Sequence, residues 1–274
     1  MKRLRTIAVL PTMFTLGNVV CGFFAIVVAA NLDKPTLETL EKIPKDSHYL
    51  WVSGILIFLA IVFDALDGQV ARLTNTMSDF GAQLDSLCDL VTFGVAPAFM
   101  LVKMCPKIEI EHSKTIWIIA ASYVACAALR LARFNVETTD DVEDHLNFRG
   151  LPAPAAAAAI AGIAIMFNRL HQPETSLLYK EQIIVVLQWL LPFFGVMVAV
   201  LMVSRLPYPH VTNQILRGQR SFGHVVAVFF AVLALAVVPA YSIPTLCVAF
   251  TLSGPVRYAW VKLVQRREQK EPLF

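Results

Sequence analysis

Long apolar stretches recur along the whole chain, and they limit the folds open to it more than any other feature of the sequence. Eight such stretches occupy residues 7–30, 49–66, 84–104, 115–134, 151–167, 183–204, 223–238 and 243–261. A helix of about 17–25 apolar residues is long enough to cross a bilayer. The sequence therefore predicts an all-α, polytopic transmembrane bundle of about eight spans, forming a single integral membrane domain over residues 1–274.

Composition excludes several other classes of protein. Hydrophobic residues make up 57% of the chain and charged residues only 16%, so the excess apolar surface must face lipid rather than water. A net charge of +3 is too small to suggest a nucleic-acid-binding protein, and a disordered chain would contain fewer aliphatic and aromatic residues. The five cysteines are scattered singly, which indicates neither a disulfide framework nor a zinc site.

Basic residues are distributed unequally between the two sides of the expected membrane. With the N-terminus placed in the cytoplasm, alternating segments put 15 Lys and Arg residues inside and 8 outside, which is the bias typical of cytoplasmic loops. An even number of spans leaves both termini inside. We therefore expect a multi-pass protein of the cell (inner) membrane, with residues 205–274 supplying the last two spans and a basic tail.

Four carboxylates interrupt the apolar pattern at the cytoplasmic edge of the second and third spans. Asp64 and Asp67 are three residues apart, and Asp85 and Asp89 are four apart, so each pair shares one helical face. Carboxylates at membrane depth are costly without cations, and they repel one another. Only Arg72 lies nearby in the sequence, and no histidine or cysteine is placed to make a softer site. The pattern therefore favours hard divalent metals such as Mg²⁺, Mn²⁺ or Ca²⁺.

The residues around these carboxylates suit a phosphate-containing ligand. Two ions about 3.5–4 Å apart can grip a diphosphate during an in-line displacement. Gly68 and Gly81 leave room for a phosphate or a flat base to approach the helix backbone. Ser78 is placed to donate its hydroxyl to phosphate oxygens, and Arg72 presents a fork that matches a diphosphate. The segment 64–89 therefore predicts phosphoryl transfer at the membrane surface.

The whole segment reads Asp64-x2-Asp67-Gly68-x2-Ala71-Arg72-x8-Gly81-x3-Asp85-x3-Asp89. This pattern resembles the full signature of the CDP-alcohol phosphotransferase family. The resemblance implies a six-helix membrane core around a di-metal site, which holds the diphosphate of a CDP-linked lipid while an alcohol displaces CMP. It implies two divalent cations, Mg²⁺ or Mn²⁺, with Ca²⁺ as an inhibitory occupant.

The resemblance also implies a role for each residue of the pattern. Asp64, Asp67, Asp85 and Asp89 would be metal ligands, and Asp89 would also be the base that deprotonates the incoming hydroxyl. The groups expected to contact the CDP-lipid are Gly68, Arg72, Ser78, Gly81 and Asn18, the last of these in the first span.

The acceptor alcohol is predicted from two further segments on the side of the aspartates. Arg130 and Arg133 end the fourth span, and Arg149 precedes the fifth; arginines beside a di-metal site suit an anionic acceptor. Residues 130–135 and 148–154 resemble the corresponding segments of membrane-type phosphatidylserine synthases. This implies CDP-diacylglycerol as donor and L-serine as acceptor. Glycerol 3-phosphate and an inositol phosphate stay open as acceptors, because the same arginines would bind them equally well.

Other readings of these residues stay open. Intramembrane carboxylates also line cation transporters, although such sites are expected near the midplane between repeated halves, and no repeat is visible here. Arg130 and Arg133 have a second interpretation as anchors against lipid headgroups. Small residues, namely Gly162 and the alanine run 155–159, suggest a homodimer contact.

Overall fold

The computed structural model describes residues 9–32, 43–74, 79–140, 150–172, 179–206, 208 and 233–268, and it contains no strand among them. The predicted all-α class is therefore confirmed. The helices are α1 (Val9–Ala30), α2 (Ile43–Leu73), α3 (Asp79–Asp89), the π-helix η1 (Leu90–Val95), α4 (Ala96–Lys103), α5 (Pro106–Glu111), α6 (Ser113–Asp140), α7 (Ala153–His171), α8 (Lys180–Val203) and α11 (Pro239–Glu268).

Six segments in the described part of the chain are long and apolar enough to cross a membrane. They are Pro11–Ala30, Ser47–Ala71, Phe80–Lys103, Ser113–Val136, Ala153–His171 and Lys180–Val203, and they correspond to the first six predicted spans. The predicted seventh span, 223–238, lies mostly outside the described residues. The eighth falls within α11, which is helical but is not among the six candidates.

The two helices that carry the aspartates extend beyond their apolar windows. The second span was expected to end at 66, but α2 continues to Leu73; the third was expected to begin at 84, but α3 begins at Asp79. The apolar windows end where charged residues appear, whereas the backbone hydrogen bonds of a helix continue through them. The four aspartates therefore project from within helices, which fixes their spacing more firmly than a loop would.

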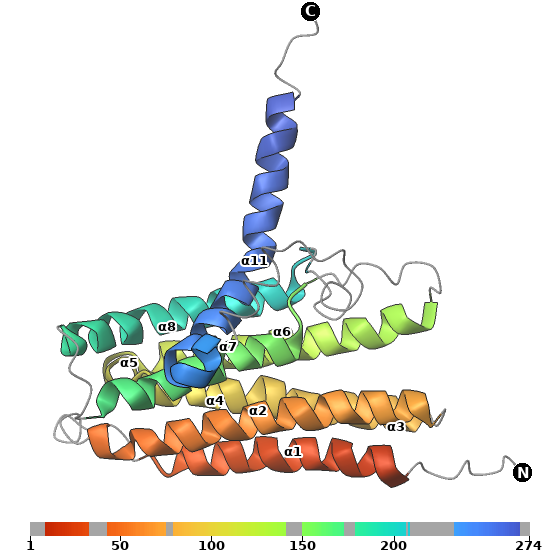
Figure 1. The fold of residues 1–274 in the computed structure, drawn as a ribbon, viewed down its shortest axis with the longest axis horizontal. Helices are drawn as coiled ribbons and strands as arrows, with labels where there is room; N and C mark the ends of the chain where they lie inside the picture. Colours follow the sequence, from red (N-terminus) through yellow and green to blue (C-terminus); the bar gives the residue numbers. More distant parts are fainter. Residues whose placement is uncertain are drawn as a thin grey trace, which may run out of the picture.

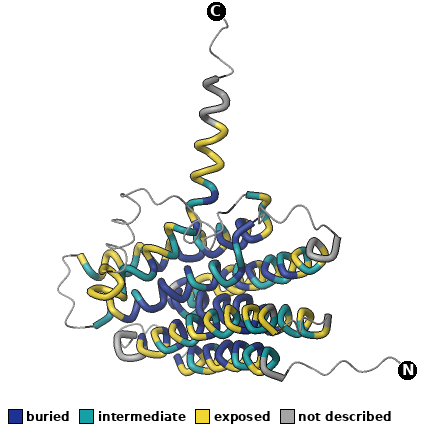
Figure 2. The backbone as a smooth tube through the Cα atoms, turned by 45° about the vertical axis from the view of Figure 1, so that its right-hand side comes forward, coloured by how far each residue is buried: buried dark blue, intermediate teal, exposed yellow. Residues whose placement is uncertain are grey.

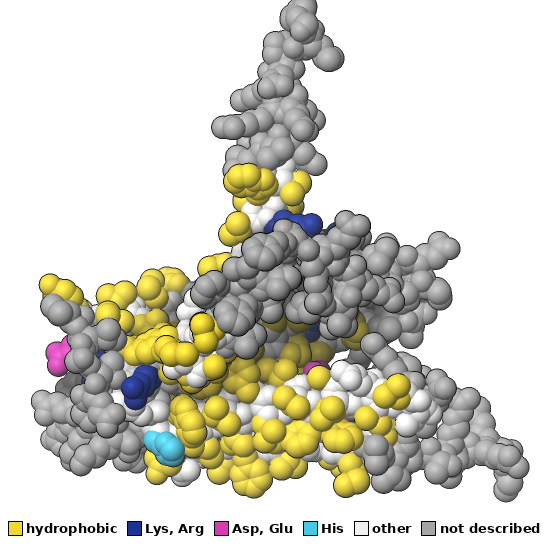
Figure 3. All heavy atoms as spheres, viewed as in Figure 1, with side chains coloured by type: hydrophobic (Ala, Val, Ile, Leu, Met, Phe, Trp, Pro, Cys, Tyr) yellow, Lys and Arg dark blue, Asp and Glu magenta, His cyan; other side chains and the backbone are white. Residues whose placement is uncertain are grey.

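The spans lie side by side as one bundle, and α11 crosses α7 before it extends away from the bundle (Figure 1). Buried residues line the inner faces of the helices and exposed residues the outer faces (Figure 2). Large apolar side chains cover much of the outer surface (Figure 3); Phe23, Val62 and Phe193 are each more than half exposed. An outer surface of this kind fits lipid, so this is a multi-pass membrane protein.

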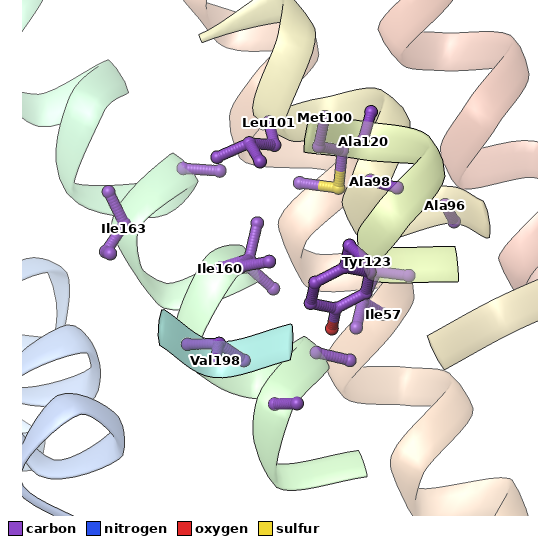
Figure 4. Packing of buried hydrophobic residues seen from close by; sticks show 14 of the residues in the cluster. Ile57, Ala96, Ala98, Met100, Leu101, Ala120, Tyr123, Ile160, Ile163 and Val198 are labelled. Atoms are coloured by element: carbon purple, nitrogen blue, oxygen red, sulfur yellow. The ribbon is translucent and has the colours of Figure 1, made fainter. Parts of the chain in front are cut away.

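The core combines small residues with a few large ones. Tyr123 of α6, Ile160 of α7 and Val198 of α8 converge with Ile57 of α2 in the centre of the bundle (Figure 4). Alanines fill much of the remaining core, including Ala25, Ala29, Ala60, Ala156, Ala157 and Ala161. Small side chains let helix backbones approach closely, which is the main source of helix attraction inside a bilayer.

Most of the small residues of α7 that suggested a dimer contact pack within this chain. Ala156, Ala157 and Ala159 are fully buried. A Cβ atom placed on Gly162 would lie 3.0 Å from the Cα atom of Pro244, so α11 already occupies that face of α7. The sequence pattern correctly marks a tightly packed helix face, but it does not reveal that the neighbouring helix comes from the same chain.

Candidate active site

Three of the predicted metal ligands meet between two helices. Asp64 and Asp67 project from α2, and Asp85 projects from α3. Each contributes a carboxylate oxygen, and these oxygens all lie within 4.8 Å of one another. The fold therefore brings together carboxylates that are separated by about twenty residues of sequence, as the predicted site requires.

The donor set fits a hard divalent cation. Asp67 is only 6% exposed. Its Oδ2 atom and the Oδ1 atom of Asp85 are buried, and neither has a hydrogen-bond partner among the described residues. A buried carboxylate oxygen without a donor is costly unless a cation compensates it. Oxygen-only ligands are those that Mg²⁺ and Mn²⁺ prefer, so the residues present can hold the metal that the pattern predicts.

Asp89 lies one turn beyond Asp85, beside this cluster. It is 7% exposed, and its charge interacts with those of Asp64, Asp67 and Asp85. Its Oδ1 atom accepts a hydrogen bond of 2.9 Å from the side-chain nitrogen of Asn18, which is fully buried in α1. One carboxylate oxygen of Asp89 is therefore held by α1, and the orientation of the other follows from it.

Arg130 of α6 lies near the same carboxylates. Its side chain is half-buried, and its charge interacts with those of Asp64 and Asp89. The sequence places only Arg72 close to the aspartates along the chain, whereas the fold adds an arginine from another span. Arg133 is one turn further along α6 and is also half-buried.

Comparison with known proteins agrees with this geometry. Residues 8–201 match the family model described as CDP-alcohol phosphatidyltransferase, and this range contains all four aspartates. The chain belongs to this family. The family resemblance of the segment 64–89 is thereby confirmed, together with the expected six-helix core.

Several relatives within this CDP-alcohol phosphatidyltransferase family carry the name CDP-diacylglycerol–serine O-phosphatidyltransferase. The protein of Methanocaldococcus jannaschii is 34% identical over 203 residues, which cover 74% of this chain and 82% of that protein. The protein of Helicobacter pylori strain 26695 is 31% identical over 202 residues, covering 73% and 71%. The Bacillus subtilis protein is 32% identical over 163 residues, covering 58% and 77%.

Of the other predicted site residues, the structure describes the two glycines but not the side chains of Arg72, Ser78 and Arg149. A Cβ atom on Gly68 would meet no heavy atom within 4 Å, so the helix backbone there is open to a ligand. Gly81 is half-buried in α3. Arg72 belongs to α2, but its side chain lies outside the described part of the structure, as do Ser78 and Arg149.

One polar pair that the sequence did not predict joins two helices of this CDP-alcohol phosphatidyltransferase beside the cluster. Ser86 Oγ donates to Asn135 Oδ1 at 3.1 Å, and Asn135 Nδ2 donates to Ser86 Oγ at 2.9 Å. Ser86 follows Asp85 in α3, and Asn135 lies two residues after Arg133 in α6. This pair ties the aspartate helix to the arginine helix. No local signal marks a lone serine between two aspartates, so sequence reasoning missed it.

Proposed function

We propose that this protein transfers the phosphatidyl group of CDP-diacylglycerol to L-serine, giving phosphatidylserine and CMP. The observation that carries the proposal is the partly buried cluster of Asp64, Asp67 and Asp85 in a CDP-alcohol phosphatidyltransferase chain. The relatives named CDP-diacylglycerol–serine O-phosphatidyltransferase, which match about three quarters of the chain, support serine as the acceptor.

Asp64, Asp67 and Asp85, together with Asp89, would hold two divalent cations, Mg²⁺ or Mn²⁺. Bound there, such ions neutralise a diphosphate and stabilise charge on the departing CMP. The carboxylates that bind them come from α2 and α3, so the diphosphate would lie across the neighbouring ends of these two helices, with the lipid tails in the bilayer. The open backbone at Gly68 gives the nucleotide part room to approach α2.

Asp89 is the proposed general base. It takes the proton of the serine hydroxyl while the serine oxygen bonds to the lipid-side phosphorus and the bond from that phosphorus to the CMP oxygen breaks. Asn18 supports this role, because its amide binds one oxygen of Asp89 and leaves the other to act. The displacement is direct and forms no covalent enzyme intermediate.

The serine carboxylate is the proposed ligand of Arg130 and Arg133, with Arg149 as a third candidate. The interaction of Arg130 with Asp64 and Asp89 supports an anion site next to the reacting groups. Guanidinium forks suit a carboxylate. They also suit a phosphate, so glycerol 3-phosphate and an inositol phosphate are the competing acceptors.

The active site and both termini are proposed to face the cytoplasm from the cell (inner) membrane. The excess of basic residues in the segments assigned to the inside supports this orientation. CDP-linked lipids and serine would then reach the aspartates from the same side.

Release of CMP by the full-length protein, purified in detergent, tests the function. The protein is supplied with CDP-diacylglycerol and Mn²⁺ or Mg²⁺, and L-serine is compared with glycerol 3-phosphate and inositol phosphate. We expect release that needs both serine and metal. Release of CMP only with another alcohol would overturn serine as the acceptor. No release with any acceptor would overturn the proposed transferase activity.

A further inference from the structure

The helix that carries Asp85 and Asp89 changes its winding directly after Asp89. Residues Leu90–Val95 form the π-helix η1, in which the N–H of Ala96 bonds to the carbonyl of Val91 five residues earlier. Pro97 explains this change, because it has no N–H to bond the Phe93 carbonyl and its ring would collide with that carbonyl in an α-helix. π-Helical turns are rare in proteins as a whole, and those that occur are often found at functional sites.

Two buried hydroxyls hold this π-helix in place. Tyr123 of α6 donates from its hydroxyl to the carbonyl of Phe93 at 3.3 Å, the same carbonyl that Pro97 deprives of a helical partner. Thr92 donates from Oγ1 to the carbonyl of Asn18 at 3.2 Å. Thr92, Phe93 and Tyr123 are all fully buried, so water does not compete for these bonds.

The bond from Thr92 closes a loop through Asn18 to Asp89. The backbone of Asn18 accepts from Thr92, while its side chain donates to Asp89. Asn18 is therefore tied at two points to one helix, at residues three positions apart. Gly22, one turn along α1, permits this approach, since a Cβ atom there would lie 2.7 Å from the Cα atom of Thr92.

We propose that Thr92 and Tyr123 are positioning residues for Asp89. Thr92 fixes Asn18, whose amide fixes one oxygen of the Asp89 carboxylate, and Tyr123 of α6 fixes the π-helix at the Phe93 carbonyl. This inference rests on the proposed function, in which the direction of the free Asp89 oxygen decides whether it can take the proton of the serine hydroxyl. Neither hydroxyl touches the substrate in this role.

The test compares steady-state kinetics of CMP release for Thr92→Val and Tyr123→Phe in the full-length protein. Each variant removes one hydroxyl and keeps the shape of the side chain. We expect kcat to fall about tenfold for Thr92→Val, within the range seen when supporting groups of a site are lost, and about threefold for Tyr123→Phe, the equivalent of one weak neutral hydrogen bond. The KM values for CDP-diacylglycerol and serine should each change less than about twofold. Thr92→Ser keeps the hydroxyl and should restore most of kcat.

Matched controls come from α11 and the residue packed on it. Thr251 is fully buried and donates to the carbonyl of Cys247 at 2.9 Å, and Tyr208 donates from its hydroxyl to the carbonyl of Thr251 at 2.9 Å. Thr251→Val and Tyr208→Phe remove equivalent hydroxyls and should leave kcat unchanged. An equal fall of kcat in these controls would show a general packing effect and overturn the proposal.

A double-mutant cycle separates positioning from simple destabilisation. If Thr92 acts through Asn18, then Thr92→Val should add little to the loss of kcat already caused by Asn18→Ala. Additive losses would overturn the proposal. Normal kcat in Thr92→Val beside an active wild-type protein would overturn this inference alone, whereas an inactive wild-type protein would overturn the proposed function and this inference with it.

Discussion

The two halves of α2 use glycine for opposite purposes. A Cβ atom on Gly54 would lie 2.9 Å from the carbonyl oxygen of Ala161 in α7, whereas a Cβ atom on Gly68 would meet nothing within 4 Å. Around Gly54 the helix is closely packed, with Ser53 and Ile57 fully buried. Around Gly68 it carries the carboxylates of Asp64 and Asp67. One half of the helix therefore secures the bundle, and the other offers an open backbone beside the site.

The largest effect is expected at Asp89 of α3, which lies beside the carboxylate-bearing half of α2. Asp89→Asn should lower kcat about 10²–10⁴-fold, because an amide cannot take the serine proton. Binding of CDP-diacylglycerol should fall much less, since one coordinating oxygen stays. Turnover and equilibrium binding of the lipid, measured on the same preparation, check this. Equal losses in both would argue against the base role, and Glu181→Gln, an exposed carboxylate on α8, should change neither.

A smaller effect is expected from the arginines that are proposed to bind serine. Arg133→Ala should raise the KM for serine about 10–100-fold, the equivalent of one charge-assisted hydrogen bond, and should raise that for CDP-diacylglycerol less. Substrate titrations of CMP release measure both. Arg205→Ala, which removes an exposed arginine just after α8, is the control. If Arg133→Ala alters only the amount of inserted protein, the arginine is a membrane anchor.

At the packed end of α2 the effect should be on stability. Gly54→Ala places a methyl group against the backbone of α7 and the side chain of Ile165, and overpacking of this kind costs about 1–3 kcal/mol. Thermal unfolding in detergent should show a lower Tm, and kcat at low temperature should stay close to the wild-type value. An unchanged Tm would mean that the two helices can separate without cost.

The smallest effect on stability is expected at Gly68. Gly68→Ala meets no neighbouring atom and adds helix propensity of about 0.5–1 kcal/mol, so Tm should stay the same or rise slightly. The KM for CDP-diacylglycerol should rise about threefold or more, because the methyl group narrows the approach to the backbone. A lower Tm with an unchanged KM would show that Gly68, like Gly54, is a packing position rather than an open approach for the ligand.

Much of the site was predictable because helical periodicity is local. The spacing of Asp64 from Asp67, and of Asp85 from Asp89, places each pair on one face of its own helix. Contacts between helices were not predictable in this way. Asn18 reaches Asp89 across 71 residues of sequence, and only the packing of α1 against α3 and η1 selects that partner. Asn18, expected beside the nucleotide, binds Asp89 with its amide in the structure.

The sequence by itself determined the class of the protein, because the length of an apolar stretch is matched directly to the thickness of a bilayer. It also determined the family, because eight residues of the segment 64–89 match the family pattern in type and spacing. Only the tertiary structure decided which other residues lie beside those positions. It placed Arg130 near the aspartates, paired Ser86 with Asn135, and separated the packed Gly54 from the open Gly68. Neighbours across helices depend on how side-chain volumes fit together over the whole bundle, and no short stretch of sequence contains that information.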